Sequence, residues 1–264
     1  MKGSDAGNIE QRAQQIMQEL LRSGRVVVED LARQFDVSPS TIRRELRVLE
    51  SKGLLRRTHG GAITIAPMLY EPFRHLSSFQ EQEEQRAGEK RRIGLAAAAL
   101  IGDGETISIG AGTTTTQVAR SLVHRKGITV VTNSVNVAME LSNRQDLKVF
   151  VSGGYLSGDW FALVGPTAMS SVTELFVDKA FIGVDGIHAE LGLTTNYPDQ
   201  ATVHRAMLRQ ARQRIVVADH GKIGIVGRAL IAMPSEINIL ITDDGASDDS
   251  IAAFAAKGMQ VLRE

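Results

Sequence analysis

The order of apolar and polar positions at the start of the chain predicts two helices. In the first, apolar residues recur every three or four positions, so they lie on one side of a helix. They are Ile9, Ala13, Ile16, Leu20 and Leu21. Ser23 and Gly24 follow this stripe and form a normal helix stop. A short second helix is expected over Glu29–Phe35, with its apolar residues facing inward.

A third helix is expected between Ser38 and Gly53, and both of its ends carry boundary residues. Ser38 is a strong N-cap, Pro39 suits the first helical position, and Gly53 ends the helix. The apolar stripe has helical spacing and consists of Ile42, Leu46 and Leu49. The outward face is polar and presents Ser40, Thr41, Arg43, Arg44 and Arg47. After this helix, Leu54–Ala62 predicts a short strand pair, or wing.

These elements together favour a DNA-binding module. An arginine-rich amphipathic helix taken alone is more often a solvated face, but three short helices, a tight turn at 36–38 and a basic wing make a winged helix-turn-helix. A capped helix with hydroxyls and arginines near its N-terminus can lie in a major groove. We therefore expect DNA contacts from the third helix and the wing. The candidate residues are Ser38, Ser40, Thr41, Arg43, Arg44, Arg47, Arg56, Arg57 and His59.

From Arg91 onward, segments typical of strands and of helices alternate. The expected strands are Thr106–Ile109, Thr129–Thr132, Lys148–Ser152, Ala180–Val184, Ile215–Ala218 and Ile237–Thr242. The expected helices are Lys90–Ile101, Thr114–Leu122, Val135–Leu141, Thr167–Leu175, Ala201–Arg212 and Asp248–Ala256. Alternation of this kind predicts an α/β fold with a doubly wound, mostly parallel sheet and helices on both faces.

The segment between these two patterns has an irregular sequence. Pro67 and Pro72 interrupt regular structure, and the stretch FQEQEEQRAGEK is polar and charged, which favours a solvated helix or a hinge over an acidic binding tail. Three parts are therefore expected. They are a winged helix-turn-helix over residues 1–62, a linker over 63–89 and an effector-binding domain over 90–264.

Small or polar residues follow the expected strands, at the edge of the sheet where ligands bind in such folds. The run Gly110–Thr116 opens a helix, so its backbone N–H groups and hydroxyls can surround an anion, although such a run is often only a turn with an N-cap. The other strand ends carry Asn133, Ser134, Gly153, Gly154, Asp185, Gly186, Asp219 and Lys222. Asn133 and Ser134 can equally cap a helix, and the glycine pair can equally form a turn. Together these ends suit a phosphorylated sugar.

Charge and composition narrow the class of protein. Apolar residues make up 43% of the chain and charged residues 23%, as in a globular protein. Thirty basic and thirty acidic residues cancel, yet residues 1–62 hold eleven Lys and Arg against eight Asp and Glu, a net charge of +3. The basic surplus therefore lies where DNA contacts are expected.

No candidate for a membrane segment, metal site or cofactor is found in the sequence. The longest apolar run, Leu95–Ile101, falls far short of the roughly 18 residues of a bilayer span, and the start lacks a hydrophobic signal core. There is no cysteine, and the six histidines show no metal-ligand spacing. We therefore expect a cytoplasmic protein without membrane contact, bound metal or cofactor.

The segment VEDLARQFDVSPSTIRRELRVLESKGLLRRTHGGA resembles the N-terminal signature of DeoR-type bacterial transcription regulators. IGAGTTTTQVARSL, SGGYLSGDWFALVGPTA and ADHGKIG are similar to the effector domain of that family, and the resemblance covers residues 10–245. The family's effector domain is similar to ribose-5-phosphate isomerases, and its members typically act as repressors released by a sugar phosphate. The resemblance implies that the phosphate is held by Gly112, Thr113, Thr114 and Thr115. It also places Asp185 and Lys222 where the isomerases keep polar active-site groups.

Three positions depart from the family pattern. Glu45 stands where the family usually has Asp, which affects a pair with a neighbouring arginine rather than the function. Gln200 and His204 stand where the family usually has Glu and Lys. The family's ligand contacts therefore do not carry over directly to these two positions.

The expected function is a repressor of a carbohydrate-utilisation operon that a phosphorylated sugar releases from its operator. The alternative is a sugar-phosphate isomerase-like enzyme, with Asp185 as the base. It is disfavoured because residues 201–213 hold no carboxylate, where the isomerases carry an essential acid, and because an enzyme has no use for the basic module. A homodimer or homotetramer is expected, since one small module buries too little DNA surface for tight binding. For Trp160, core or interface packing is favoured over sugar stacking.

Overall fold

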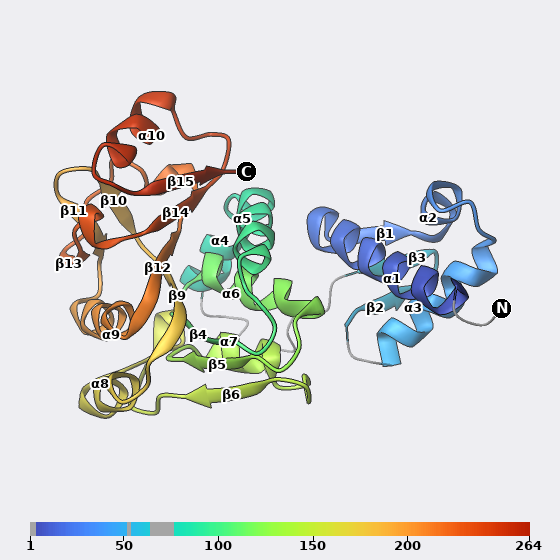
Figure 1. Ribbon diagram of the computed structural model, residues 1–264, viewed down its shortest axis with the longest axis horizontal. Helices are drawn as coiled ribbons and strands as arrows, with labels where there is room; N and C mark the ends of the chain where they lie inside the picture. Colours follow the sequence, from blue (N-terminus) through green and yellow to red (C-terminus); the bar gives the residue numbers. More distant parts are fainter. Residues whose placement is uncertain (1–3, 52–53, 64–76) are drawn as a thin grey trace. The chain divides into compact units, whose positions relative to one another are not determined.

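The computed structural model describes residues 4–51, 54–63 and 77–264. The chain divides into two compact units, Met1–Phe73 and Arg74–Glu264, shown in Figure 1. The expected helix stop Gly53 and the linker prolines Pro67 and Pro72 lie outside the described residues.

The N-terminal unit is a winged helix-turn-helix. Its helices are α1 (Ser4–Ser23), α2 (Val28–Gln34) and α3 (Pro39–Ser51), and its strands are β1 (Arg25–Val27), β2 (Arg56–Thr58) and β3 (Gly61–Ile63). The three predicted helices and the strand pair of the wing are confirmed. β1 was not predicted, because three residues are too few for a period. It pairs antiparallel with β3, whose other edge pairs with β2.

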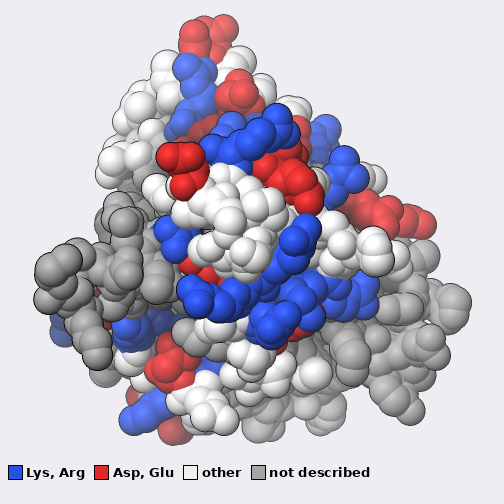
Figure 2. Space-filling model, turned by 90° about the vertical axis from the view of Figure 1, so that its right-hand side faces the viewer, with Lys and Arg blue, Asp and Glu red and all other residues white. Residues whose placement is uncertain are grey.

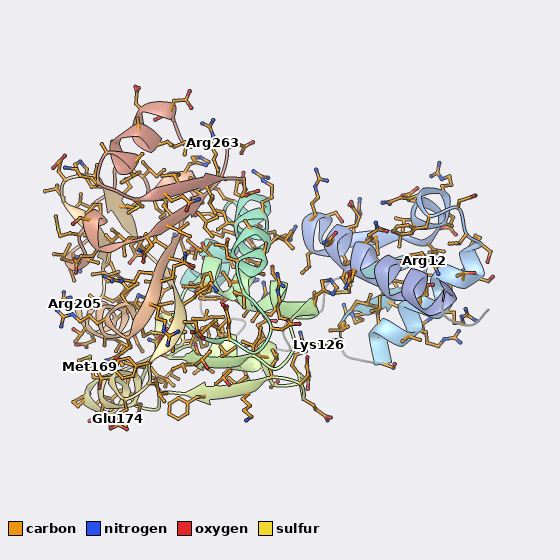
Figure 3. The ribbon with its side chains drawn as sticks, in the orientation of Figure 1. Arg12, Lys126, Met169, Glu174, Arg205 and Arg263 are labelled. Atoms are coloured by element: carbon orange, nitrogen blue, oxygen red, sulfur yellow. The ribbon has the colours of Figure 1, made fainter. Side chains whose placement is uncertain are left out.

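The core of this unit joins all three helices. Its fully buried side chains include Ile16, Leu20, Leu31, Ile42 and Leu46. A charged pair connects two of these helices, since the guanidinium of Arg12 on α1, labelled in Figure 3, donates to both carboxylate oxygens of Glu45 on α3. The partner of Glu45 is therefore not one of the neighbouring arginines of α3 but a residue 33 positions earlier in the chain. This pair sets α3 against α1.

The C-terminal unit is built on a seven-stranded parallel sheet with the order β15-β14-β12-β9-β4-β5-β6. The strands are β4 (Thr106–Ile109), β5 (Thr129–Thr132), β6 (Lys148–Val151), β9 (Val177–Gly183), β12 (Ala211–Val217), β14 (Ile239–Thr242) and β15 (Gln260–Arg263). The chain first adds strands outward from β4 on one side, then returns to β9 and adds strands on the other side. The doubly wound α/β fold is confirmed, and its switch point lies between β4 and β9.

Helices cover both faces of this sheet (Figure 1). The helices are α5 (Ala87–Ala99), α6 (Thr113–Arg120), α7 (Val135–Leu141), α8 (Pro166–Thr173), α9 (Pro198–Arg209) and α10 (Asp248–Ala255). One hydrophobic core lies under α5, α6 and α7 and includes Ile93, Val118 and Phe181. The other lies under α8, α9 and α10 and includes Ile182, Val203 and Phe254. Neighbouring residues of β9 thus point into opposite cores, as strand geometry requires.

The structure also contains elements that the sequence pattern did not predict. These are strand β15, the hairpin β7 (Tyr155–Ser157) and β8 (Ala162–Val164), and a small antiparallel sheet of β10 (Gly186–His188), β11 (Gly192–Thr195) and β13 (Ala229–Ala232). Helix α4 (Ser77–Glu84) lies in the charged stretch where a solvated helix or a hinge was expected. The expected end of the helix before β12 was wrong, because Ala211 and Arg212 belong to strand β12. No helix in the described part of the chain combines the length and apolarity that crossing a bilayer requires.

Candidate functional site

The outward face of α3 carries the hydroxyl and arginine side chains that the sequence placed there. Ser40, Arg43, Arg44 and Arg47 are exposed, and Thr41 is half-buried. The Ser38 hydroxyl accepts a hydrogen bond from the Thr41 backbone N–H at 3.2 Å, which caps the helix. The apolar stripe of α3 therefore fixes which side chains remain available to a partner.

The arginines of this surface differ in how firmly the protein holds them. Arg57 of the wing donates to Glu50 at 2.7 Å, and these hydrogen bonds lower the pKa of the Glu50 carboxyl below its usual value. Arg43 lies 3.4 Å from Glu29 in an exposed pair. Arg44, Arg47 and Arg56 make no ion pair within the described ranges 4–51, 54–63 and 77–264. These three guanidinium groups are thus the ones most available to a phosphate or a base edge.

Lys and Arg side chains gather in a band across the face of the N-terminal unit that is turned to the viewer in Figure 2. His59, Arg56 and Arg57 of the wing are exposed beside α3 in the same unit. Basic side chains on one face give a surface the electrostatic character that DNA-binding modules share.

A cavity that opens to solvent lies in the C-terminal unit, beyond the carboxyl ends of β4 and β9. We call it the switch-point cavity, since the strand order reverses there. Its walls come from several strand ends and helix starts. They are formed by Gln82, Ala111, Gly112, Thr113, Thr114, Trp160, Gly183, Val184, Asp185, Thr195, Gln200 and Lys222.

The Gly112–Thr114 wall is the first turn of α6. Backbone N–H groups at such a turn have no partner within the helix. Thr113 and Thr114 are each 8% exposed and reach the cavity. Thr115 and Thr116 turn inward instead, and both hydroxyls donate to the Gly112 carbonyl, at 2.9 and 2.8 Å. The sequence placed Thr115 with its neighbours at the phosphate, but its hydroxyl closes the loop.

Asp185 and Lys222 bring opposite charges to the same cavity. One carboxylate oxygen of Asp185 accepts from the Thr195 hydroxyl and from the Asn196 N–H, both at 2.8 Å. Lys222 follows β12, and it forms no ion pair with any residue that the structure describes. The cavity thus combines a helix start, hydroxyls, a carboxylate and a lysine.

Six other residues proposed from the sequence do not line this cavity, and one of them is Asp219, whose carboxylate accepts from the Gly221 N–H at 3.1 Å. Asn133 is fully buried, accepts from the Ala111 N–H at 3.1 Å and donates to the Leu163 carbonyl. Ser134 caps α7 by accepting from the Val137 N–H. The remaining three are Gly153, Gly154 and Gly186.

The local backbone requires glycine at these three positions. Gly153 and Gly154 have φ values of +68° and +108° in the turn after β6, and a Cβ on Gly154 would lie 2.5 Å from the Val164 carbonyl oxygen. A Cβ on Gly186 would lie 2.3 Å from the Ile225 carbonyl oxygen. Asn133, Ser134 and the glycines therefore shape the loops around the cavity rather than its surface.

The sequence analysis missed several lining residues. Trp160 packs edge-on against Phe79 and Tyr197, with ring centroids 6.3 and 5.6 Å away, and it also faces the cavity. Its indole N–H is buried and has no hydrogen-bond partner among the residues that the structure describes. The sequence favoured a packing role for Trp160, but this side chain both packs and lines the cavity. Gln82 comes from α4, in the charged stretch that was expected to be a linker. Nothing in that stretch signals a wall residue.

α4 is held to the rest of the C-terminal unit by contacts on several sides. Glu83 pairs with Arg120 at 2.6 Å, and Arg120 also pairs with Glu140, whose pKa is raised by burial. The buried ammonium of Lys90 donates to the Gln82 and Gln85 carbonyls at the end of α4. Burial lowers the pKa of Lys90 to about 8. The helix that supplies Gln82 is thus anchored next to the cavity.

Gln200 and His204 lie one helical turn apart on α9, below the cavity. The Gln200 amide donates to the Ala111 carbonyl at 3.2 Å and lies 3.5 Å from His204 Nε2. His204 is fully buried, and burial lowers its pKa to about 4, although the charge of Asp185 opposes this shift. The imidazole is therefore neutral near pH 7 and packs under Gly110, where a Cβ would lie 2.9 Å from Nε2.

This buried histidine should make the C-terminal unit sensitive to acid. An unfolded histidine binds a proton near pH 6.5, whereas folded His204 does so only near pH 4, so stability present above pH 6.5 is lost as the pH falls toward 4. The loss is on the order of 3 kcal/mol. Urea unfolding followed by the fluorescence of Trp160, the single tryptophan, measures it. The His204→Gln variant should lose less stability than the parent between pH 7 and 4, and exposed His59→Gln should behave as the parent does. Equal losses in parent and His204→Gln would contradict the assignment.

Comparison with known proteins was made over both units. Residues 12–67 match the family described as DeoR-like helix-turn-helix domain, and residues 85–244 match the DeoR C terminal sensor domain. The HTH-type transcriptional regulator GlpR of Haloferax volcanii is 36% identical over 235 residues, which cover 89% of this chain and 90% of GlpR. The HTH-type transcriptional repressor GlcR of Bacillus subtilis is 35% identical, over 89% of this chain and 88% of GlcR.

Solved structures give a more distant similarity. Ribose 5 phosphate isomerase A from Neisseria gonorrhoeae is 18% identical, with a TM-score of 0.37, over 53% of this chain and 54% of the isomerase. Similarity at this level says nothing about function.

Proposed function

The chain belongs to the DeoR family of transcriptional regulators, and on that premise we propose that it represses a carbohydrate-utilisation operon until a phosphorylated sugar binds the switch-point cavity. Family membership makes it a DNA-binding regulator rather than an isomerase-like enzyme. The repressed operon, the sugar phosphate and the residues that contact each ligand are parts of the proposal. GlcR, similar over most of its length, is named a repressor, which supports the direction of control.

One observation supports the proposed ligand above all others. The start of a helix, which can bind an anion, and a lysine both line the same cavity. Unpaired N–H groups at the first turn of α6 favour a phosphate, and the positive end of the helix dipole adds to this. The Thr113 and Thr114 hydroxyls can donate to the same oxygens, and Lys222 can neutralise their charge. The phosphate would therefore lie at the Gly112–Thr114 wall.

The rest of the cavity suits the sugar part of the ligand. Only one carboxylate oxygen of Asp185, Oδ2, accepts from Thr195 and Asn196. The other oxygen is available, and a carboxylate oxygen accepts well from a sugar hydroxyl. Gln200 uses its N–H₂ group on the Ala111 carbonyl, which leaves its amide oxygen as a further acceptor at the cavity. The indole of Trp160 offers an apolar surface to the carbon skeleton. These partners recognise hydroxyls and a phosphate together.

α4 is the proposed route from the ligand to the DNA-binding module. It supplies Gln82 to the cavity, packs Phe79 against Trp160, and precedes the rest of the C-terminal unit in the chain. A ligand that draws Gln82 and Trp160 inward would move α4. The chain segment from the N-terminal unit leads into α4, so its end would move as well. Such a ligand shifts the equilibrium only by its differential affinity for the two states.

The DNA contacts are proposed to come from the exposed side chains of α3 and the wing in a homodimer or homotetramer. Two modules related by symmetry double the contact with DNA, which one small module needs for tight binding. The operator would then hold two half-sites spaced by about 10 base pairs or a multiple.

A titration of labelled operator duplex in the presence of sugars tests the proposal. Each phosphorylated sugar is compared with its free sugar and with inorganic phosphate. At least one phosphorylated sugar should weaken operator binding by about 5- to 150-fold, while its free sugar should have no effect. Equal release by the free sugar would contradict a phosphate at α6. No release by any member of a broad panel would contradict the effector class.

A further inference from the structure

A second pocket, open to solvent, lies in the C-terminal unit at the end of α9. Three arginines line it: Arg205 and Arg209 from α9, and Arg214 from β12. Leu208 and Ile237 form part of an apolar floor. Arg205 lies at the outer edge of the unit (Figure 3). We call this space the arginine cavity.

The three arginines have no acidic partner in the described part of the chain. Arg205 donates to the backbone carbonyls of Leu230 and Ile231, and Arg214 donates from one terminal nitrogen to the Glu236 carbonyl at 3.0 Å. Arg209 is exposed. The carboxylate of Glu236 also lines the cavity, but it accepts from the Met233 N–H at 2.7 Å and forms no ion pair with these arginines. Positive charge therefore exceeds negative charge around this space.

One donor of the cluster is buried and unpaired. The Nε–H group of Arg214 is inaccessible to solvent and has no hydrogen-bond partner among the described residues. A buried N–H of a charged group without an acceptor is unfavourable, and native structures usually supply one. Solvent does not reach this Nε–H, so a bound anion would not contact it directly; it would offset the surplus positive charge at the guanidinium groups that line the pocket.

We propose that the arginine cavity binds a phosphate group carried by a small molecule with a short apolar part. Guanidinium groups match phosphate oxygens in geometry and remain charged at any physiological pH. The apolar floor favours a monoester over free inorganic phosphate, because Leu208 and Ile237 can contact an apolar substituent but not a bare ion.

This site is separate from the switch-point cavity, and the two share no lining residue. α9 connects them, since Gln200 near its start faces the first cavity and Arg209 at its end faces the second. The two positions are about 13 Å apart along the helix axis. β12 makes a second connection, with Arg214 in its middle and Lys222 five residues after its end at Val217. Two ligands would thus contact opposite ends of α9.

Calorimetric titration of the full chain with propyl phosphate and with inorganic phosphate tests the inference. The titrations use the Thr113→Val, Thr114→Val background, so that any binding at α6 is weakened, and the readout does not depend on DNA or on the proposed effector. Propyl phosphate should bind more tightly than inorganic phosphate. Arg209→Ala should weaken its binding about tenfold to hundredfold, the effect of losing a charge-assisted hydrogen bond.

Arg212→Ala is the matched control. Arg212 is close in sequence and 86% exposed, but it pairs with Asp178 and does not line the cavity. This variant should bind propyl phosphate within about twofold of the background, since the Arg212 charge is exposed to solvent and is paired with Asp178. Equal weakening by Arg209→Ala and Arg212→Ala would reveal general charge attraction and overturn the site. Absence of any binding, or a preference for inorganic phosphate, would overturn it as well.

Discussion

Replacement of Arg44 by alanine should weaken specific operator binding by about 1–3 kcal/mol, or roughly 5- to 150-fold. Arg44 is exposed near the start of α3, and no ion pair with a described residue holds it. Its guanidinium is therefore free to reach a base edge, and Arg43 beside it differs only by its long contact with Glu29. The loss should be largest on the operator and small on unrelated duplexes. Fluorescence anisotropy with both duplexes at several salt concentrations measures it.

Two controls separate base contacts from phosphate contacts and from general charge. Arg57→Ala should weaken binding to all sequences alike and reduce the salt slope by about one, because we expect this wing arginine, held by Glu50, to contact the DNA backbone. Arg33→Ala removes an exposed arginine of α2 that pairs with Asp30. This variant should change operator affinity little. If Arg44→Ala bound the operator as tightly as the parent, the proposed recognition face would be wrong.

The double substitution Thr113→Val, Thr114→Val should leave operator binding intact and abolish the response to the sugar phosphate. Valine has nearly the shape of threonine, so the change removes two hydroxyls at the switch-point cavity and little else. Each hydrogen bond to a charged oxygen contributes about 1.5–3 kcal/mol. The effector concentration for half-release should therefore rise by a factor on the order of 100 or more. Operator titrations at increasing effector concentration give this midpoint.

Thr202→Val is the matched control for that substitution. Thr202 is an exposed residue of α9 whose hydroxyl bonds to the Pro198 carbonyl, away from the cavity. It should keep the parent's midpoint. Release of the double variant at the parent's effector concentration would place the phosphate elsewhere. Loss of operator binding by the double variant would make the two threonines structural rather than sensing.

The sequence predicted those parts of the fold that repeat a period over many residues. The stripe of Ile42, Leu46 and Leu49 identified α3 and its outward face, and compact apolar runs identified β4 and β5 at their observed bounds. β1 and the antiparallel strands β10, β11 and β13 are three or four residues long. Their pairing is set by tertiary contacts, so no local period could reveal them.

The candidate ligand site was predicted in outline only. The strand-end rule located Thr113, Asp185 and Lys222, because parallel strands bring their carboxyl ends to one edge. It could not separate a residue that faces the cavity from one that supports a loop. Asn133 has the same chemistry in either role, and only its bonds to Ala111 and Leu163 decide. Gln82 arrives from a helix distant in sequence, which no local signal indicates.

The most direct test of the account is the reciprocity of the two binding events. Calorimetry gives the affinity of the sugar phosphate for the free protein and for the protein saturated with operator, and anisotropy gives the operator affinity with and without sugar phosphate. Linkage requires the same factor in both experiments, and we expect about 5- to 150-fold. Equal factors would support one ligand site coupled to DNA binding. A sugar phosphate that binds with the same affinity to free and operator-bound protein would contradict the account.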